Sequence, residues 1–237
     1  MSNTRLRRIE LLEQQQTAYR KRKQLLTDKL WVQDATRDAY LWVTNHTQTW
    51  NEHWCEEGRP GPYEPFPQWP YLADLFEILA LERIIWIEKS RDMMVSWACV
   101  AYLTLEAMKV PHRGVLFQTQ KENKVKQLIR YAKTLYERQD ERIKKAYPLA
   151  KELSLQSDLS LEFAHGGKIT GIPGGAHQIR SYHPWGYLND ESSLQPDAGE
   201  CYNEALSAVK GKIIFNSSAG PGWFADARKD ITRNVED

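Results

Sequence analysis

Short apolar blocks and helical stretches alternate along most of the chain. The apolar blocks are typical of buried strands and cover residues 84–87, 115–118, 185–188 and 212–215. The stretches between them, at residues 72–81, 96–108, 121–138 and 196–209, are typical of helices. Residues 159–163 alternate apolar and polar side chains, and a Gly166-Gly167 turn before residues 168–172 predicts a hairpin. This alternation predicts an α/β fold with a mostly parallel central sheet flanked by helices.

An N-terminal helical segment is predicted before this region. Residues 4–26 lack glycine and proline and are rich in basic side chains, so a solvated helix face and a contact with DNA or a partner protein are both open. Residues 28–57 carry a stripe at helical spacing, which we interpret as core rather than as a base-stacking surface. Its members are Trp31, Ala35, Ala39, Trp42, His46, Trp50 and Trp54.

Prolines and glycines mark the boundary of the main domain. Residues 58–70 contain two glycines and five prolines, which a helix interior does not tolerate. We therefore assign residues 1–57 to the N-terminal helical segment, residues 58–70 to a linker or adenine-side loop, and residues 71–237 to the main domain.

Composition narrows the classes of function. Lys+Arg number 32 and Asp+Glu number 31, which leaves a net charge near +1, so a DNA contact would need a local basic patch. Cys55, Cys99 and Cys201 lie too far apart for a disulfide framework or for metal-ligand spacing. No apolar run reaches the ~18 residues that a membrane span needs. We therefore expect a cytoplasmic protein without a membrane contact.

Residues 84–108 have the layout of a phosphate-binding strand, loop and helix. The consensus loop is G-x-x-x-x-G-K-[ST], and this chain matches it only at Ser96. Lys89 and Met94 stand at the two glycine positions, and Val95 stands at the lysine position. The order of strand, loop and helix therefore fits a phosphate-binding loop, but the residues of the loop do not match the consensus.

Adjacent carboxylates end a later strand and suit nucleotide hydrolysis. Asp190 at the strand tip can hold Mg²⁺ through its water shell, and Glu191 can orient and deprotonate an attacking water. Ser217 and Ser218 end the next strand, where hydroxyl groups can contact the γ-phosphate or the glutamate. Gln68, which lies beside aromatic residues, is suited to reading an adenine edge; a packed loop with a surface glutamine is the alternative.

Four landmarks occur in order: Gln68-Trp69, the loop at residues 89–96, Leu188-Asn189-Asp190-Glu191, and residues 217–224. Together they resemble the ATPase domain of the phage terminase large subunit, the motor that pumps DNA into an empty capsid. The resemblance covers residues 66–230 and implies a P-loop NTPase fold of the ASCE type. It also implies ATP and Mg²⁺ as cofactors, and it implies ATP hydrolysis coupled to translocation of double-stranded DNA. The family's nuclease half has no room after Asp237, so we expect the ATPase domain without it.

The resemblance also implies roles for single residues. In the loop of Lys89, Ser90, Arg91 and Asp92, it implies Arg91 as the phosphate-binding cation, with Lys89 as the alternative. It further implies Gln68 with Trp69 as the adenine site, Ser96 as the Mg²⁺ hydroxyl, Asp190 as the metal carboxylate, Glu191 as the general base, and Ser217, Ser218 and Ala219 as the coupling element. Arg180 is implied as an arginine finger that reaches into a neighbouring subunit.

The implied partners are double-stranded DNA, further copies of the chain in a ring, a small terminase subunit and a capsid portal, all within an infected host cell. Two other functions remain open. Met94 and Val95 are compatible with a nucleotide-binding module that has lost hydrolysis, and the fold is also compatible with a helicase-like ATPase.

Overall fold

A six-stranded sheet forms the centre of the computed structural model, which describes residues 3–150 and 157–233. In spatial order its strands are β3 (Ile84–Lys89), β8 (Lys212–Ser218), β7 (Gly186–Asp190), β4 (Gly114–Thr119), β6 (Lys168–Pro173) and β5 (Ser160–Glu162). All neighbouring pairs are parallel except β5 with β6, which forms the predicted hairpin. The predicted α/β class with a mostly parallel sheet is therefore confirmed.

The strand order decides which segments meet. Strand β8 lies between β3 and β7, so the ends of these three parallel strands share one edge of the sheet. The register pairs Lys89 with Ser218 and Asp190 with Asn216. Insertion of a strand between the loop strand and the carboxylate strand is the arrangement of the predicted ASCE-type P-loop NTPase fold. Ligands of such sheets bind beyond the carboxyl ends of the strands.

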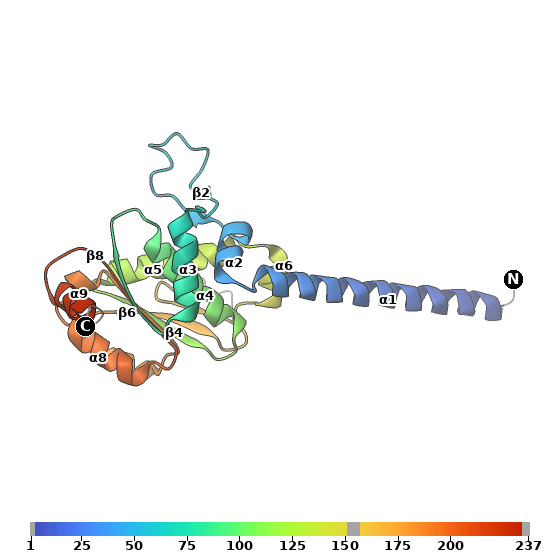
Figure 1. Ribbon diagram of the computed structural model, residues 1–237. Helices are drawn as coiled ribbons and strands as arrows, with labels where there is room; N and C mark the ends of the chain where they lie inside the picture. The colour runs from blue at the N-terminus through green and yellow to red at the C-terminus, as the bar shows by residue number, and fades with distance from the viewer. Residues whose placement is uncertain (1–2, 151–156, 234–237) are drawn as a thin grey trace.

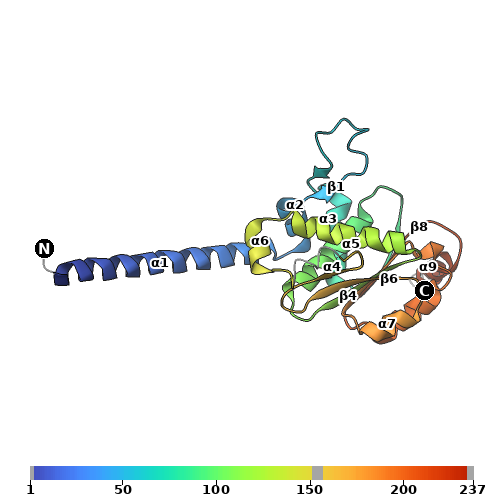
Figure 2. The same ribbon diagram turned by 180° about the vertical axis from the view of Figure 1, so that it is seen from behind.

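Helices cover both faces of the sheet (Figures 1 and 2). One face carries α3 (Pro70–Leu81), α4 (Val95–Lys109) and α5 (Glu122–Glu137), followed by the short α6 (Glu141–Ala146). The other face carries α7 (His177–Tyr182), α8 (Ala198–Ala208) and α9 (Trp223–Arg233). Successive strand residues point to opposite faces, so Leu188 packs with the first group and Tyr187 with the second.

The N-terminal segment departs from its prediction. Helix α1 (Asn3–Ala35) continues nine residues past residue 26, and α2 (Ala39–His46) begins after Asp38, whose side chain accepts a 2.9 Å hydrogen bond from the Leu41 N–H. The prediction of a helix to residue 57 is wrong beyond His46. There the chain becomes extended and forms a small ribbon of β1 (Thr49–Trp50) with β2 (Tyr63–Glu64). Cross-strand pairing of Trp50 with Tyr63 replaces the helical turn that spacing alone suggested.

The tryptophan stripe divides where the helix ends. Ala35, Ala39 and Trp42 are buried in the core shared with α3 and α4, as predicted. Trp42 is fully buried, and its indole N–H donates a 3.1 Å hydrogen bond to Gln139 Oε1. Trp50, in contrast, is 37% exposed. The core interpretation therefore holds only for the helical part of the stripe.

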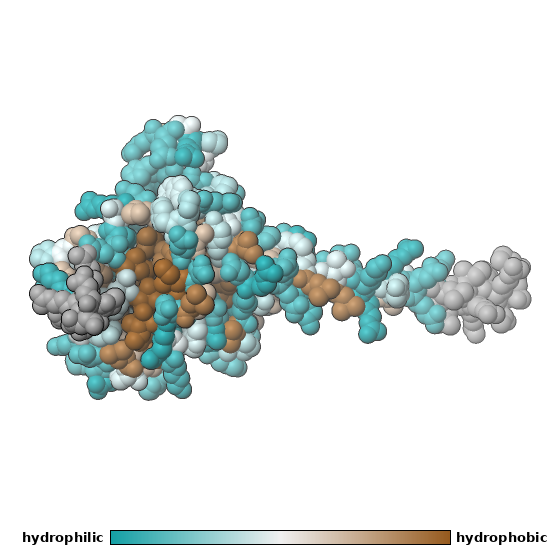
Figure 3. Space-filling model, in the orientation of Figure 1, coloured by the Kyte–Doolittle hydropathy of each residue, from teal (hydrophilic) through white to brown (hydrophobic). Residues whose placement is uncertain are grey.

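Most of α1 projects away from the sheet into solvent (Figure 1). Figure 3 shows an apolar band on this otherwise hydrophilic helix, where the exposed apolar residues are Tyr19, Leu25, Leu26 and Leu30. Among the described residues, no helix is both long and apolar enough to cross a membrane.

Candidate functional site

The loop after β3 takes a path that normally requires glycine. Asp92 and Met94 have φ angles of 59° and 55°, in the left-handed region. Met94 occupies the N-cap position of α4 and stands where the consensus loop has a glycine. The partly buried side chain of Met94 packs against the core of α3 and α4. The loop thus keeps a glycine-like backbone conformation while its methionine side chain packs against the core.

Three side chains from three elements converge at the start of α4. Ser96 Oγ donates a hydrogen bond to Asp190 Oδ1 over 2.9 Å. Asn216 Nδ2 donates to the same oxygen over 2.6 Å and to Ser96 Oγ over 3.2 Å. The predicted metal pair of Ser96 and Asp190 is therefore brought together, with an amide bridging the two residues.

The burial of Asp190 affects its charge. Burial raises the pKa of Asp190 to about 6, while the positive charge of Lys89 and the hydroxyl of Ser96 limit the rise. A nearby cation favours the ionised form of a carboxyl group. A divalent ion bound beside Asp190 would therefore stabilise its carboxylate.

Glu191 lies against Lys89 at the same edge. Lys89 Nζ is 2.9 Å from Glu191 Oε1, and the Ser218 N–H donates to Glu191 Oε2 over 3.4 Å. Burial raises the pKa of Glu191, but the hydrogen bond and charge of Lys89, together with Ser218, outweigh this effect and leave the pKa below its usual value. Glu191 is therefore a carboxylate at neutral pH, as a general base must be.

The two predicted coupling serines are attached to the turn that follows Glu191. Ser217 Oγ donates to Ser193 Oγ over 2.7 Å and accepts from the Ser193 N–H over 3.0 Å. Ser193 Oγ in turn donates to the Ser218 carbonyl over 3.2 Å. These hydrogen bonds couple the end of β8 to the turn after Glu191, so that a displacement of one would shift the other.

Aromatic residues of the predicted adenine site lie near the phosphate loop. Trp69 precedes α3 and stacks on Tyr71, with ring centroids 5.7 Å apart. Tyr71 Oη donates a 3.2 Å hydrogen bond to the Met93 carbonyl in the loop. Gln68 is exposed next to this pair. Trp69 of the predicted adenine site is therefore linked to the loop through Tyr71, and Gln68 is its neighbour in the sequence.

Other predicted residues are not gathered into this cluster. Ser90, Arg91 and Asp92 are exposed at the outer part of the loop, whereas the side chain of Lys89 is only 10% exposed. Arg180 lies on α7, and its guanidinium pairs with Glu204 of α8 rather than with a residue of the loop or the carboxylate turn. Its side chain is 68% exposed, so it faces the surroundings of the molecule.

Sequence reasoning missed Asn216 and Tyr71 as members of the site. A signal existed for Asn216, because it is a polar residue that ends an apolar strand, and buried polar groups must find partners. Its amide oxygen is buried without a hydrogen-bond partner among the described residues. Tyr71 is one of the aromatic residues near Gln68, but nothing in the sequence indicated its hydrogen bond to the loop.

The donor set fits magnesium better than a metal held in a protein cage. No group of three or more His, Cys, Asp or Glu residues in the described part of the chain could hold a metal ion. Ser96 and Asp190 offer hard oxygen donors, and Mg²⁺ is usually held by one or two carboxylates together with waters and substrate phosphates. The residues present therefore fit Mg²⁺ that arrives with a nucleotide.

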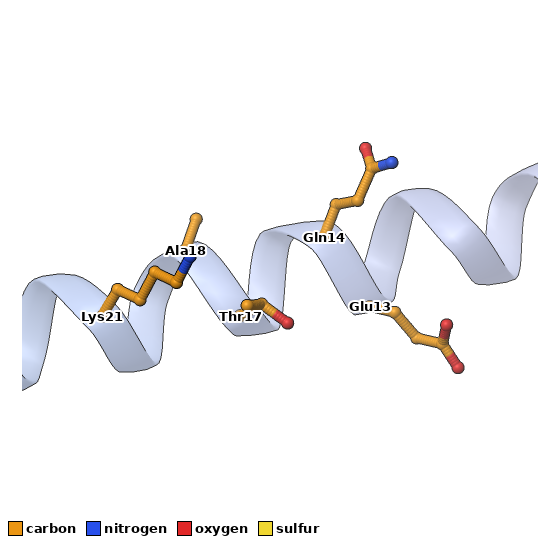
Figure 4. Close-up of a pocket in the computed structure, with 5 residues that line it drawn as sticks. All are labelled: Glu13, Gln14, Thr17, Ala18 and Lys21. Atoms are coloured by element: carbon orange, nitrogen blue, oxygen red, sulfur yellow. The ribbon is translucent and has the colours of Figure 1, made fainter.

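A shallow hollow on α1 has no comparable chemistry. Figure 4 shows that its lining residues all come from this one helix: Glu13, Gln14, Thr17, Ala18 and Lys21. A hollow without an opposing wall cannot enclose a ligand.

Comparison with known proteins gives few matches. No family model matches the sequence, and no curated protein matches it. Among solved structures, a mutant of the large terminase ATPase domain of Thermus phage P74-26 is similar, with a TM-score of 0.44 and 14% identity over 65% of this chain and 72% of that chain. That domain in a second structure has a TM-score of 0.44 and 12% identity over the same shares. The overlap is partial and the sequence identity is low in both comparisons.

Proposed function

We propose that this chain is a Mg²⁺-dependent ATPase, the motor domain of a viral DNA-packaging terminase large subunit that drives double-stranded DNA into a capsid. One observation carries the ATPase part of the proposal. The hydroxyl of Ser96 at the start of α4 lies 2.9 Å from Asp190, and the next residue, Glu191, is an ionised carboxylate at the same edge of the sheet. The motor part follows from the resemblance of the ordered motifs to the terminase family.

The phosphates would lie over the loop and the start of α4. Free N–H groups and the positive end of the helix dipole favour an anion there. Lys89 lies inside the site and Arg91 at its exposed rim, so the geometry supports Lys89 as the first cation to reach a phosphate. Arg91, which the resemblance favours, would then contact the phosphates from the exposed side of the loop.

Magnesium, when bound with ATP, would neutralise charge on the phosphate oxygens. Ser96 and Asp190 would hold it, and the hydrogen bonds of Asn216 would fix the positions of these two side chains. Glu191 would orient the attacking water and accept its proton. Lys89 Nζ donates a hydrogen bond to one carboxylate oxygen of Glu191. If the ammonium group moved to a phosphate when nucleotide binds, Glu191 would become available as a base only in the nucleotide-bound state.

The decisive experiment is a Mg²⁺-ATPase assay with and without double-stranded DNA, comparing the wild type with Glu191→Gln. We expect Glu191→Gln to bind ATP and to lose turnover, because the amide cannot accept the proton. Asp190→Ala should also lose turnover, through loss of the metal. Wild-type turnover in Glu191→Gln would reject the assignment of the base. Stimulation of the wild type by DNA would support the motor part of the proposal.

Ring assembly makes a separate prediction about Arg180. An exposed arginine on α7 can act only on a neighbouring molecule if it is a finger, so specific activity should rise with protein concentration. Arg180→Ala should abolish that rise and leave ATP binding intact. Activity that is independent of concentration and unaffected by Arg180→Ala would reject the finger. Contacts with a small subunit and a capsid portal belong to the same proposal.

A second candidate is a nucleotide-binding module without hydrolysis. The Lys89–Glu191 ion pair favours it, because a carboxylate that stays paired with an ammonium group is a poor base. Mg²⁺-dependent hydrolysis that disappears in Asp190→Ala would reject this candidate.

A further inference from the structure

Two buried amide side chains interrupt the otherwise apolar surroundings of the carboxylate strand. Asn189 lies between Leu188 and Asp190 in β7 and is fully buried, and Gln195 follows Glu191 by four residues and is 4% exposed. Burying an amide without partners is costly. The partners of these two amides therefore indicate what they hold in place.

The two amides bind each other, and the Asn189 amide uses its full hydrogen-bonding capacity. Gln195 Nε2 donates to Asn189 Oδ1 over 2.6 Å, and Asn189 Nδ2 donates back to Gln195 Oε1 over 3.4 Å. Asn189 Oδ1 also accepts from Ser192 Oγ over 2.8 Å, and its Nδ2 also donates to Tyr187 Oη over 2.8 Å. Both donors and both acceptor sites of the Asn189 amide are thus satisfied. A fully satisfied buried network is rigid.

Side chains that follow Glu191 are hydrogen-bonded to backbone carbonyls that precede it. Gln195 Nε2 donates to the Asp190 carbonyl over 3.0 Å. Ser192 Oγ lies 3.0 Å from the Asn189 carbonyl and 2.8 Å from Asn189 Oδ1, so its one hydroxyl proton is shared between these two acceptors. The turn that carries Glu191 is thereby closed by side-chain hydrogen bonds.

Glu191 needs such support because of its backbone. Its φ angle is 56°, in the left-handed region, which a residue with a Cβ rarely adopts. Such a conformation persists where the surrounding structure over-determines it, and these positions concentrate at functional sites. Beyond the amide pair, the network leads away from Glu191, since Tyr187 Oη donates to Gln118 Oε1 and Gln118 Nε2 donates to the Gly175 carbonyl over 3.2 Å.

We propose that Asn189 and Gln195 are positioning residues, which hold Glu191 in its left-handed conformation and so direct its carboxylate toward the phosphate loop. This inference rests on the proposed ATPase function. Both residues are buried and act through the backbone of Glu191.

The test compares Gln195→Met with Tyr187→Phe. Gln195→Met keeps the length and burial of the side chain and removes its bonds to Asn189 and to the Asp190 carbonyl. Tyr187→Phe is the matched control, because it removes an equally buried polar group from the same network and leaves the bonds to the Glu191 turn in place. Thermal unfolding of both variants measures how much stability each has lost.

We expect kcat of Gln195→Met to fall by roughly 10- to 100-fold, the loss typical of a catalytic group misplaced by about 1 Å. Its KM for ATP should stay within about threefold of the wild type, because the phosphate and metal side chains are unchanged. Tyr187→Phe should keep kcat within about threefold. Equal losses of kcat in both variants, or a rise in KM that accounts for the loss in Gln195→Met, would overturn the proposal.

A second measurement does not require turnover. In the turn, the Leu194 N–H donates to the Glu191 carbonyl over 3.0 Å, and the Gln195 N–H donates to the Ser192 carbonyl over 3.1 Å. Hydrogen–deuterium exchange without nucleotide should be faster across residues 191–195 in Gln195→Met and in the milder Ser192→Ala, and unchanged there in Tyr187→Phe. Unchanged exchange in both turn variants would overturn the proposal even if the protein hydrolyses ATP. If the wild type shows no Mg²⁺-dependent ATP hydrolysis, the proposed ATPase function fails, and the exchange comparison still decides whether the amide pair holds the turn.

Discussion

Replacing Lys89 with methionine removes the cation that holds Glu191. The two charged atoms are 2.9 Å apart, and the side chains of Lys89 and Glu191 are 10% and 30% exposed. At that separation and an effective dielectric constant of about 20, their attraction is roughly 6 kcal/mol, most of which is offset by desolvation of the two ions. Removing one partner of a fully buried pair costs about 3–5 kcal/mol. Because Glu191 is partly exposed, we expect the free energy of unfolding of Lys89→Met to fall by about 2 kcal/mol.

Thermal unfolding checks this value, which corresponds to a drop in Tm of roughly 4–8 °C for a chain of this size. The double variant Lys89→Met with Glu191→Gln should recover most of the loss, because it leaves no carboxylate without a partner. If Lys89→Met melts like the wild type, or if the double variant melts no higher than the single one, the ion pair does not stabilise this edge of the sheet.

The same substitution decides which cation binds phosphate. In a Glu191→Gln background, which should bind ATP without turnover, Lys89→Met should weaken ATP binding by about tenfold or more, since a hydrogen bond to a charged group is worth about 1.5–3 kcal/mol. Arg91→Met should change the affinity much less, because Arg91 lies at the exposed rim. The opposite order of effects would refute the geometric argument and support the assignment of Arg91 that the resemblance implies.

Three further predictions concern single side chains. Asn216→Leu removes the amide that bridges Ser96 and Asp190, so the Mg²⁺ dependence of ATP binding, measured by calorimetry, should shift by roughly 10-fold or more toward higher Mg²⁺; an unchanged dependence would show that the bridge is dispensable. The side-chain hydrogen bond of Arg142 lowers the pKa of Asp140 to about 2, so this carboxylate adds stability at neutral pH that is lost as the pH falls from about 4 to 2. The Tm difference between wild type and Asp140→Asn should therefore vanish over that range, and a difference that persists at the lowest pH would refute the linkage. Lys212 donates to the Ala80 carbonyl over 2.8 Å at the end of α3, so Lys212→Met should lower the free energy of unfolding by about 2 kcal/mol in urea titrations, and a loss below 0.5 kcal/mol would show that this cap is not needed.

Much of the fold followed from local patterns in the sequence. The apolar blocks of β3, β4, β7 and β8 are short and separated by helical stretches, so the element types and the parallel sheet were predictable. The prediction failed at residues 47–57, because tryptophans at a spacing of three or four residues suggested a helix. Only the pairing of Trp50 with Tyr63, which lies within the proline-rich segment, explains why the chain is extended there. Helix α7, which carries Arg180, has six residues and too little periodicity to be predicted.

The candidate site divides in a similar way. Residues that end parallel strands or begin the helix after a strand must lie at one edge of the sheet, which made Ser96, Asp190, Glu191 and Ser217 predictable as a group. The spatial order of the strands in the sheet could not be predicted from local sequence patterns. It places β8 next to β3 and β7, and so brings Asn216 between Ser96 and Asp190.

The sequence by itself determined the element types, the parallel sheet and the order of the polar residues at its edge, because these depend on patterns within a few residues. Only the tertiary structure decided which cation faces the base, how a methionine occupies the glycine position of the loop, and which amides hold Glu191. Met94 and the amide pair act on residues near them in the sequence, but both are packed against other elements. The pairing of Lys89 with Glu191 depends on the distance between residues that are 102 positions apart in the sequence. Such distances are set by the packing of the sheet and its helices, which local propensity does not encode.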